Sequence, residues 1–113
     1  MNPVRSRIPL PALVRVHGRS MLPTYREGDV LLVVRGIRPR TGRPAVVRLP
    51  PGPDGRPRPV SVKRVTGPDP DDSTRWWIDS DNAAEGVTSF EVGSLDDECI
   101  LAVVVGLLRR GLG

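Results

Sequence analysis

The sequence predicts a mainly β, single-domain fold of short, coiled sheets, and three observations support this prediction. The length of 113 residues fits one domain with a modest core, so residues 1–113 are treated as a single domain. Apolar, β-branched runs are short and separated by turn-forming residues, with no convincing amphipathic helix between them. Thirteen prolines and twelve glycines are typical of a chain that turns often.

The first half of the chain contains three predicted strands. Residues 13–16 alternate apolar and polar side chains, whereas residues 30–34 and 45–49 are rich in valine and leucine, as buried strands are. Between them, a turn or a single helical turn is expected at residues 22–28, and a loop at residues 38–44.

The second half begins with residues 50–59, which hold five prolines and two glycines and are predicted to form an exposed hairpin connection. The strands expected after it lie at residues 60–65, 75–79, 90–92 and 100–105, with a turn at 67–73 and a loop at 80–89. The nine apolar residues 100–108 are too few for a membrane helix, which needs about twenty, so they predict a buried strand.

Composition excludes several classes of protein. No signal peptide is expected, because residues 1–10 contain two arginines and interrupting prolines but no continuous apolar stretch. The lone Cys99 rules out a disulfide within the chain, and one Cys with one His disfavours the usual zinc sites. We therefore expect a cytoplasmic protein, where a lone thiol stays reduced, with no metal.

Charge is distributed unevenly along the chain. Residues 1–60 carry twelve arginines against three acidic side chains, a net charge of +9, whereas residues 61–113 carry five basic and ten acidic groups, a net charge of −5. A basic half suggests an anionic partner, such as nucleic acid or a membrane surface. The arginines are scattered, however, and no nucleic-acid-binding motif is visible, so we favour a solvated surface and predict no nucleic-acid partner.

Lys63 is the only lysine beside sixteen arginines. Codon bias explains many arginines, but unlike arginine a buried lysine can lose its proton and act as a base. Alternation along residues 60–65 places Lys63 on one face with Ser61 and Val65. Burial on that face would lower the pKa of the amine, and the resulting loss of stability would imply a function.

Ser20 follows a glycine turn, so its hydroxyl can project from a tight bend while successive N–H groups point outward, as an oxyanion site requires. His17 is the conventional base for a serine nucleophile, but no third group is evident to orient it. A neutral lysine is the alternative base. We interpret His17 and Cys99 as packing residues.

Four motifs occur in order: Gly-Arg-Ser-Met-Leu-Pro-Thr at 18–24, Gly-Asp-Val-Leu-Leu-Val at 28–33, Val-Lys-Arg-Val at 62–65 and Trp-Ile-Asp-Ser-Asp-Asn at 77–82. With them the chain resembles, over residues 14–105, the serine–lysine peptidases of the type I signal peptidase and LexA-like superfamily. The resemblance implies that superfamily's fold of coiled sheets, a protein precursor substrate bound as an added β-strand, and no cofactor.

The resemblance also implies roles for particular residues. Ser20 would be the nucleophile and Lys63 the general base. The oxyanion hole and substrate groove would involve Gly18, Ser20 and Met21. The structural positions would be Asp29, Asp81 and Asn82.

The chain departs from the family after the Asp-Asn pair. Family members tend to continue towards Ser-X-Asp-Ser-Arg, in which the first serine supports the lysine and an Asp–Arg pair braces the loop. Residues 86–90 have neither feature, so the hydroxyls considered for supporting the lysine are Ser61, Thr88 and Ser89. If none serves, the chain would be a catalytically degenerate binding module.

The short length of the chain and the Trp76-Trp77 pair before the Asp-Asn turn suggest a particular branch of the superfamily. Without a membrane anchor or a helix-turn-helix before Ser20, the chain looks most like nickel-type superoxide dismutase maturation proteases. That likeness implies an endopeptidase that removes an N-terminal propeptide; the alternative is signal-peptidase-like processing of another substrate. The oligomeric state is not predicted.

Overall fold

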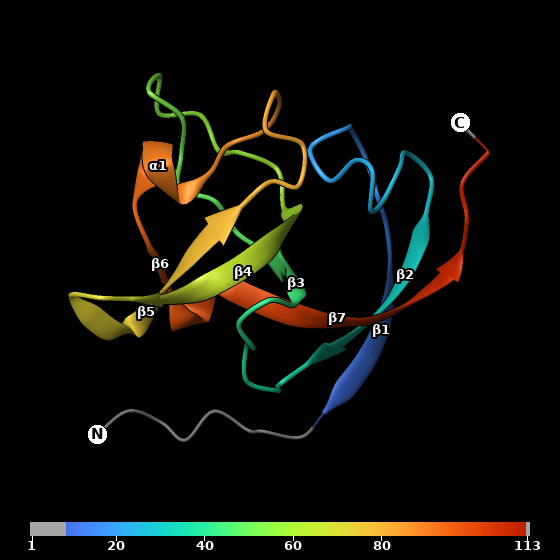
Figure 1. The fold of residues 1–113 in the computed structure, drawn as a ribbon, viewed down its shortest axis with the longest axis horizontal. Helices are drawn as coiled ribbons and strands as arrows, with labels where there is room; N and C mark the ends of the chain where they lie inside the picture. Colours follow the sequence, from blue (N-terminus) through green and yellow to red (C-terminus); the bar gives the residue numbers. More distant parts are fainter. Residues whose placement is uncertain (1–8, 113) are drawn as a thin grey trace.

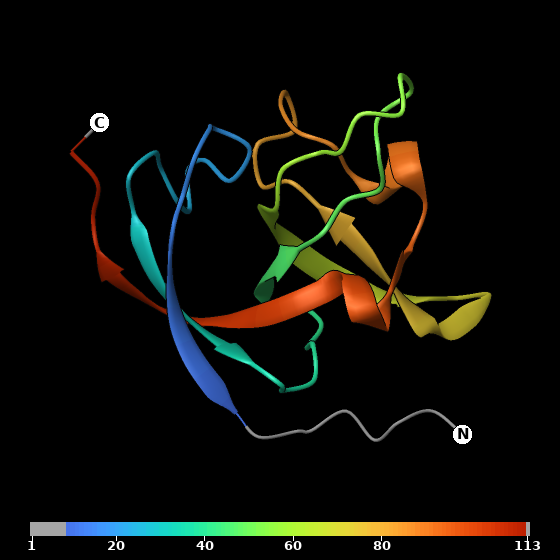
Figure 2. The ribbon, with the colours of Figure 1, turned by 180° about the vertical axis from the view of Figure 1, so that it is seen from behind.

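The computed structural model describes residues 9–112, which form one antiparallel sheet that curls on itself (Figures 1 and 2). Its seven strands lie in the order β1-β2-β7-β3-β4-β5-β6. Their bounds are β1 Leu10–Arg15, β2 Val30–Arg35, β3 Pro44–Val47, β4 Ser61–Asp69, β5 Asp72–Asp79, β6 Leu95–Asp96 and β7 Ile100–Arg109. The predicted mainly β fold is therefore confirmed, including the proline-rich connection at 50–59, which joins the antiparallel pair β3 and β4.

The strand predicted at residues 90–92 is wrong, because this segment lies in the short helix α1, Ser89–Val92. The Thr88 hydroxyl accepts a hydrogen bond from the backbone N–H of Phe90 and so caps the first turn. Gly93 then ends the helix with a φ of 77°, a conformation that favours glycine. A 3-10 turn, Asp97–Cys99, also precedes β7.

The central strand is β7, which joins the two halves of the sheet. Its first half pairs with β3, from Ile100 to Val103, and its second half pairs with β2 out to Arg109. Figure 1 shows β1 and β2 on one side of this long strand and β3 to β6 on the other. The loop that carries Ser20 and the strand that carries Lys63 therefore belong to opposite halves.

Each half has its own apolar core, on opposite faces of the sheet. The core of the β1-β2 half includes Leu31, Val33 and Val46, while the core of the β4-β5 half includes Ala45 and Val65. Neighbouring residues of β3 thus point into different cores, as the alternation of a strand requires. Burial on both faces explains why β3 contains no polar side chain.

Asp29 fixes the start of β2. Its carboxylate is fully buried and accepts hydrogen bonds from the backbone N–H groups of Arg26 and Gly111 at 3.0 and 2.7 Å and from Arg110 Nη1 at 2.9 Å. Burial by itself would raise the pKa of Asp29, but these donors and the Arg110 charge outweigh it and lower the pKa. The carboxylate joins the loop before β2 to the segment after β7.

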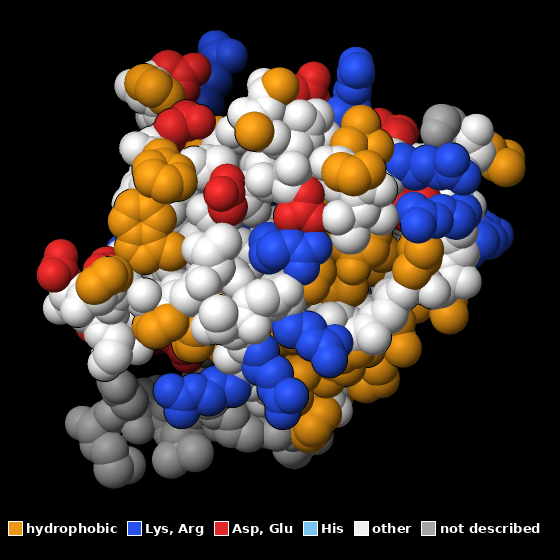
Figure 3. Space-filling model, viewed as in Figure 1, with side chains coloured by type: hydrophobic (Ala, Val, Ile, Leu, Met, Phe, Trp, Pro, Cys, Tyr) orange, Lys and Arg blue, Asp and Glu red, His pale blue; other side chains and the backbone are white. Residues whose placement is uncertain are grey.

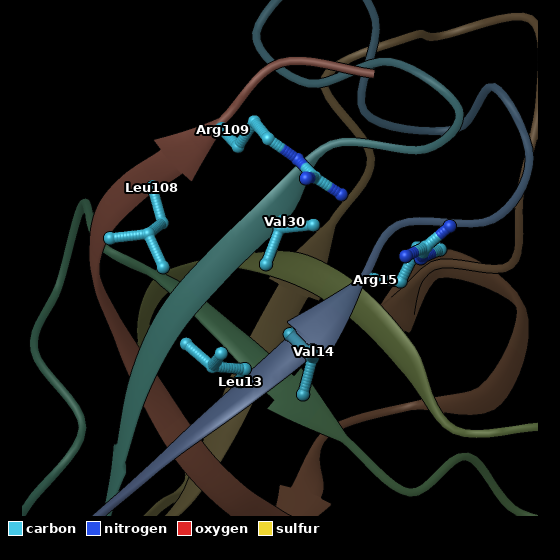
Figure 4. Close-up of a pocket in the computed structure, with 6 residues that line it drawn as sticks. All are labelled: Leu13, Val14, Arg15, Val30, Leu108 and Arg109. Atoms are coloured by element: carbon cyan, nitrogen blue, oxygen red, sulfur yellow. The ribbon is translucent and has the colours of Figure 1, made fainter. Parts of the chain in front are cut away.

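Apolar side chains are also exposed on the β1-β2-β7 side. A hollow of about 550 Å³ is lined by Leu13, Val14, Arg15, Val30, Leu108 and Arg109 from these three strands (Figure 4). Leu13 and Leu108 are both more than half exposed. Within residues 9–112 the structure contains no helix of the length and apolarity that a membrane crossing requires.

Candidate active site

The loop between β1 and β2 presents Ser20. Met21 and Tyr25 anchor this loop, because they are only 2% and 9% exposed and pack in the core of the β1-β2 half. A hydrogen bond from the Tyr25 N–H to the Met21 carbonyl, 2.9 Å long, closes the turn between them. The prediction that Met21 lines a substrate groove is corrected accordingly, because its side chain is enclosed and anchors the loop. Ser20 itself is partly exposed.

Lys63 lies on β4 and is only 2% exposed, although it is the largest of the fully buried side chains. It shares its face with Val65, as alternation predicted, and pairs with Ala45 of β3. Burial lowers the pKa of the Lys63 amine below its ordinary value of 10.5, and the charges of Asp79 and Glu91 only partly oppose this effect. The environment thus favours the neutral amine that a general base needs.

The hydroxyl that contacts Lys63 is that of Ser80, which the sequence did not identify. Lys63 Nζ donates to Ser80 Oγ over 2.9 Å, and both side chains are buried. Their meeting depends on a β-bulge: Val65 pairs with Ile78 but Gly67 pairs with Trp77, so β4 contains one extra residue. With the register then set by Arg64 opposite Asp79, Ser80 comes to lie opposite Lys63. A shift of this register by one residue would place Asp79 or Asp81 opposite Lys63 instead.

The three hydroxyls predicted to support the lysine have other partners. Ser61 Oγ donates to the carbonyl of Pro59, and Thr88 Oγ1 caps α1. Ser89 Oγ accepts from the backbone N–H of Ile78 over 2.8 Å, which joins α1 to β5. These contacts correct the prediction for Ser61, Thr88 and Ser89.

The Asp–Arg brace that the sequence seemed to lack is present at another position. Arg64 Nε and Nη2 donate to the two carboxylate oxygens of Asp81 at 2.8 and 2.7 Å, and Thr24 Oγ1 donates to the same carboxylate. These hydrogen bonds with Arg64 lower the pKa of Asp81, although burial opposes them. Since Thr24 belongs to the loop of Ser20, the brace ties that loop to the strand of Lys63.

Asn82 completes this connection. Its backbone N–H donates to the carbonyl of Ser20 over 2.9 Å, and its side-chain amide donates to the carbonyl of Arg19 over 3.0 Å. The peptide groups on both sides of Ser20 are therefore held by the segment that follows β5. The residues predicted as structural, Asp81 and Asn82, lie between the two candidate catalytic residues.

Gly86 marks the point where the site converges. A Cβ at this position would lie 2.5 Å from Lys63 Nζ, 2.6 Å from Ser80 Oγ and 2.7 Å from Ser20 Cβ. All three atoms thus lie within 2.7 Å of one point, although they come from three separate segments of the chain. Only glycine leaves space for them, and its φ of 92° also favours glycine.

The structure also places the other residues that the sequence singled out. Gly18 has a φ of 85° and open space around it, so it provides the bend before Ser20. Among the residues that the structure describes, none accepts a hydrogen bond from the N–H of Ser20. His17 is exposed and faces Glu27 at 3.4 Å, so it is not the packing residue that we predicted. No group of three His, Cys, Asp or Glu side chains within 9–112 is placed to hold a metal ion.

This arrangement suits acyl transfer. A partly exposed hydroxyl lies beside a buried amine whose neutral form is favoured, and an N–H group is available next to the nucleophile for a developing oxyanion. The amine is held in turn by a third group, Ser80, as the orienting residue of a catalytic triad holds its base.

Comparison with known families agrees with this chemistry. Residues 10–105 match the family model described as Peptidase S24-like, which consists of serine–lysine dyad peptidases. No curated protein matches the chain. Because the family model covers most of the sequence and the curled antiparallel sheet is consistent with that fold, the chain belongs to the Peptidase S24-like family.

Proposed function

We propose that this protein is an endopeptidase in which Ser20 is the nucleophile and Lys63 the general base. The observation that carries the proposal is the burial of the only lysine, 2% exposed, at the point where Ser20, Ser80 and Gly86 converge. A lysine that served only as a surface charge would extend into solvent. An enclosed amine without a carboxylate hydrogen bond lowers stability wherever it is protonated, and a catalytic role explains why it is kept.

In the proposed mechanism, neutral Lys63 Nζ accepts the proton of the Ser20 hydroxyl as Ser20 Oγ attacks the substrate carbonyl. The N–H of Ser20 donates to the oxyanion that forms. Protonated Lys63 then gives its proton to the leaving amine, which breaks the peptide bond and leaves an acyl ester on Ser20. Water, deprotonated by Lys63, hydrolyses this ester and restores the hydroxyl.

Ser80 and Gly86 are positioning residues in this scheme. The hydroxyl of Ser80 holds Nζ in one orientation at its buried position on β4. Gly86 allows the backbone after Asn82 to approach Ser20, Ser80 and Lys63 closely. The rival interpretation, a degenerate binding module, rested on the apparent lack of a supporting hydroxyl and a brace, and Ser80 with the Arg64–Asp81 pair removes that reason.

For the physiological substrate we propose an N-terminal propeptide, removed in the cytoplasm from a nickel superoxide dismutase precursor. The support is the resemblance of the Trp76-Trp77 pair, placed shortly before Asp81-Asn82, to the maturation proteases of that enzyme. Trp76 is buried while Trp77 is half-buried and packs edge-on against the exposed Phe90, at a ring distance of 5.4 Å. A substrate bound as an added strand would find these aromatic side chains beside β5.

Ser20→Ala and Lys63→Arg should each abolish cleavage, because the first removes the nucleophile and the second replaces the base by a group that cannot lose its proton. Two substrates separate the general proposal from the specific one: a proteome-derived peptide library and a purified nickel superoxide dismutase precursor, both analysed by mass spectrometry. Wild-type protein should cut library peptides and should cut the precursor at one bond near its N-terminus.

Circular dichroism should show that both variants remain folded. Cleavage of library peptides by either variant at the wild-type rate would contradict the Ser20–Lys63 mechanism. An intact precursor alongside cleaved library peptides would reject only the proposed substrate.

Ser80→Ala should lower kcat about tenfold to hundredfold, because loss of one buried hydrogen bond to the amine costs on the order of 1–3 kcal/mol. The matched control is Ser61→Ala, which removes a hydroxyl from the same face of β4 that does not contact Lys63. The rate of library cleavage is measured against pH for both. If Ser80→Ala kept the wild-type profile, or if Ser61→Ala lost as much activity, the positioning role of Ser80 would be wrong.

Gly86→Ala should reduce activity about a hundredfold, since a methyl group would displace the atoms of the dyad by the order of 1 Å. Gly55→Ala is the control: its φ of 79° imposes similar backbone strain, but no atom lies within 4 Å of the new methyl group. Peptide cleavage and thermal unfolding are measured for both variants. Equal losses of activity in the two would show that backbone strain, and not the close approach at Gly86, is responsible.

A further inference from the structure

A second concave feature lies outside the candidate active site. It is a hollow of about 410 Å³, here called the arginine hollow, and its lining consists of Ile37, Arg38, Arg40, Arg43, Val103 and Val105. Figure 3 shows basic side chains gathered over the connection between β2 and β3, where Ile37 and the three arginines lie. Aliphatic side chains and guanidinium groups thus share one small surface.

The three arginines of the hollow are unpaired. Neither Arg38, Arg40 nor Arg43 has a side-chain hydrogen bond or an ion pair with any residue in the part of the chain that the structure describes. By contrast, Arg64 and Arg110 each bind a carboxylate. A single unpaired arginine is an ordinary solvated side chain, but three around one apolar hollow create a local positive potential.

The connection that carries these arginines is firmly held. Arg43 N–H donates to the carbonyl of Arg40 over 3.1 Å, and the Gly42 N–H donates to the carbonyl of Val65 over 2.7 Å. Val65 N–H donates back to the carbonyl of Arg43, and the Arg64 side chain donates to the carbonyl of Gly42. A loop fixed in this way loses little entropy when a ligand binds, which favours a binding site over a passive charged surface.

The hollow is also close to the candidate active site. Val103 of its lining pairs with Ala45, and Ala45 pairs with Lys63, so the two sites lie two strands apart. At the usual spacing of strands this is a separation of about 10 Å across the sheet. A substrate that contacts both places must pass around β3, which is buried on both faces.

We propose that the arginine hollow is a docking site for an acidic segment of the protein substrate. Its glutamate or aspartate side chains pair with Arg38, Arg40 and Arg43, and an aliphatic side chain between them packs on Val103 and Val105. The identification of the partner as a protein substrate rests on the proposed function. It adds a recognition element that is separate from Ser20 and Lys63.

The observations favour a peptide over a nucleic acid. The residues that line the hollow include no aromatic side chain on which a base could stack. The aliphatic lining, in contrast, suits a peptide that combines acidic and apolar residues.

The test measures binding in the Ser20→Ala background, so that its result does not depend on cleavage. The probe is a fluorescein-labelled dodecapeptide containing three repeats of Glu-Leu-Glu-Ser, and fluorescence polarisation gives its Kd. Replacing Arg38, Arg40 and Arg43 together by glutamine should weaken binding about tenfold, because three charge-assisted contacts are lost. The matched control replaces Arg15, Arg48 and Arg109 by glutamine. These arginines are also exposed, and their replacement removes the same net charge elsewhere.

Support for the proposal is a large loss of affinity in the first triple variant and less than a twofold change in the control. Equal losses in both would mean that only net charge matters, and would overturn it. Equally tight binding of the same peptide with Gln in place of Glu would also overturn it. Tighter binding of a twelve-nucleotide single-stranded DNA, lost in the first triple variant, would make the hollow a nucleic-acid site and reject the proposal.

Discussion

The burial of the Lys63 amine is the constraint around which the rest of the site is built. A lysine that is 2% exposed on an apolar strand has its pKa lowered by burial, despite the opposing charges of Asp79 and Glu91. The folded protein therefore binds fewer protons than the unfolded chain between that lowered pKa and 10.5, and the free energy of unfolding rises with pH across this window. At lower pH the protonated amine opposes folding, so the surrounding contacts must hold it in place.

Two neighbouring residues of β4, Lys63 and Arg64, make stabilising contacts on opposite faces of the sheet. Lys63 donates to Ser80 while Arg64 binds Asp81, so two consecutive residues of β4 contact the two residues that directly follow β5. Asn82 then holds the peptide groups around Ser20. The short segment 80–82 therefore contacts Lys63, braces β4 through Arg64 and fixes the loop of Ser20. This explains how a domain with two small cores can hold two candidate catalytic groups that come from different halves of its sheet.

Much of the fold could be predicted because it depends on local pattern. Valine-rich runs identified β2 and β7, and the density of proline identified the exposed connection at 50–59. The errors arose where a local cap, a bulge or the direction of a side chain decides the outcome. Residues 90–92 have strand-like side chains, yet the cap at Thr88 turns them into a helix. Ser80 was overlooked because its position opposite Lys63 depends on one extra residue in β4, and sequence alternation alone cannot reveal a bulge. Met21 was misassigned because motif similarity does not indicate the direction of a side chain.

The central claim is that the amine of Lys63 is buried and has a lowered pKa, and the single lysine allows this to be measured directly. Protein labelled with 13C at the lysine Cε carbon should give one lysine signal, which can be followed by NMR from neutral to alkaline pH without assignment. The account predicts that this signal titrates well below 10.5 in the folded protein and returns to about 10.5 in denaturant. A folded-state titration at 10.5 or above would contradict it, because the amine would then be a charged group at neutral pH and could not act as a base.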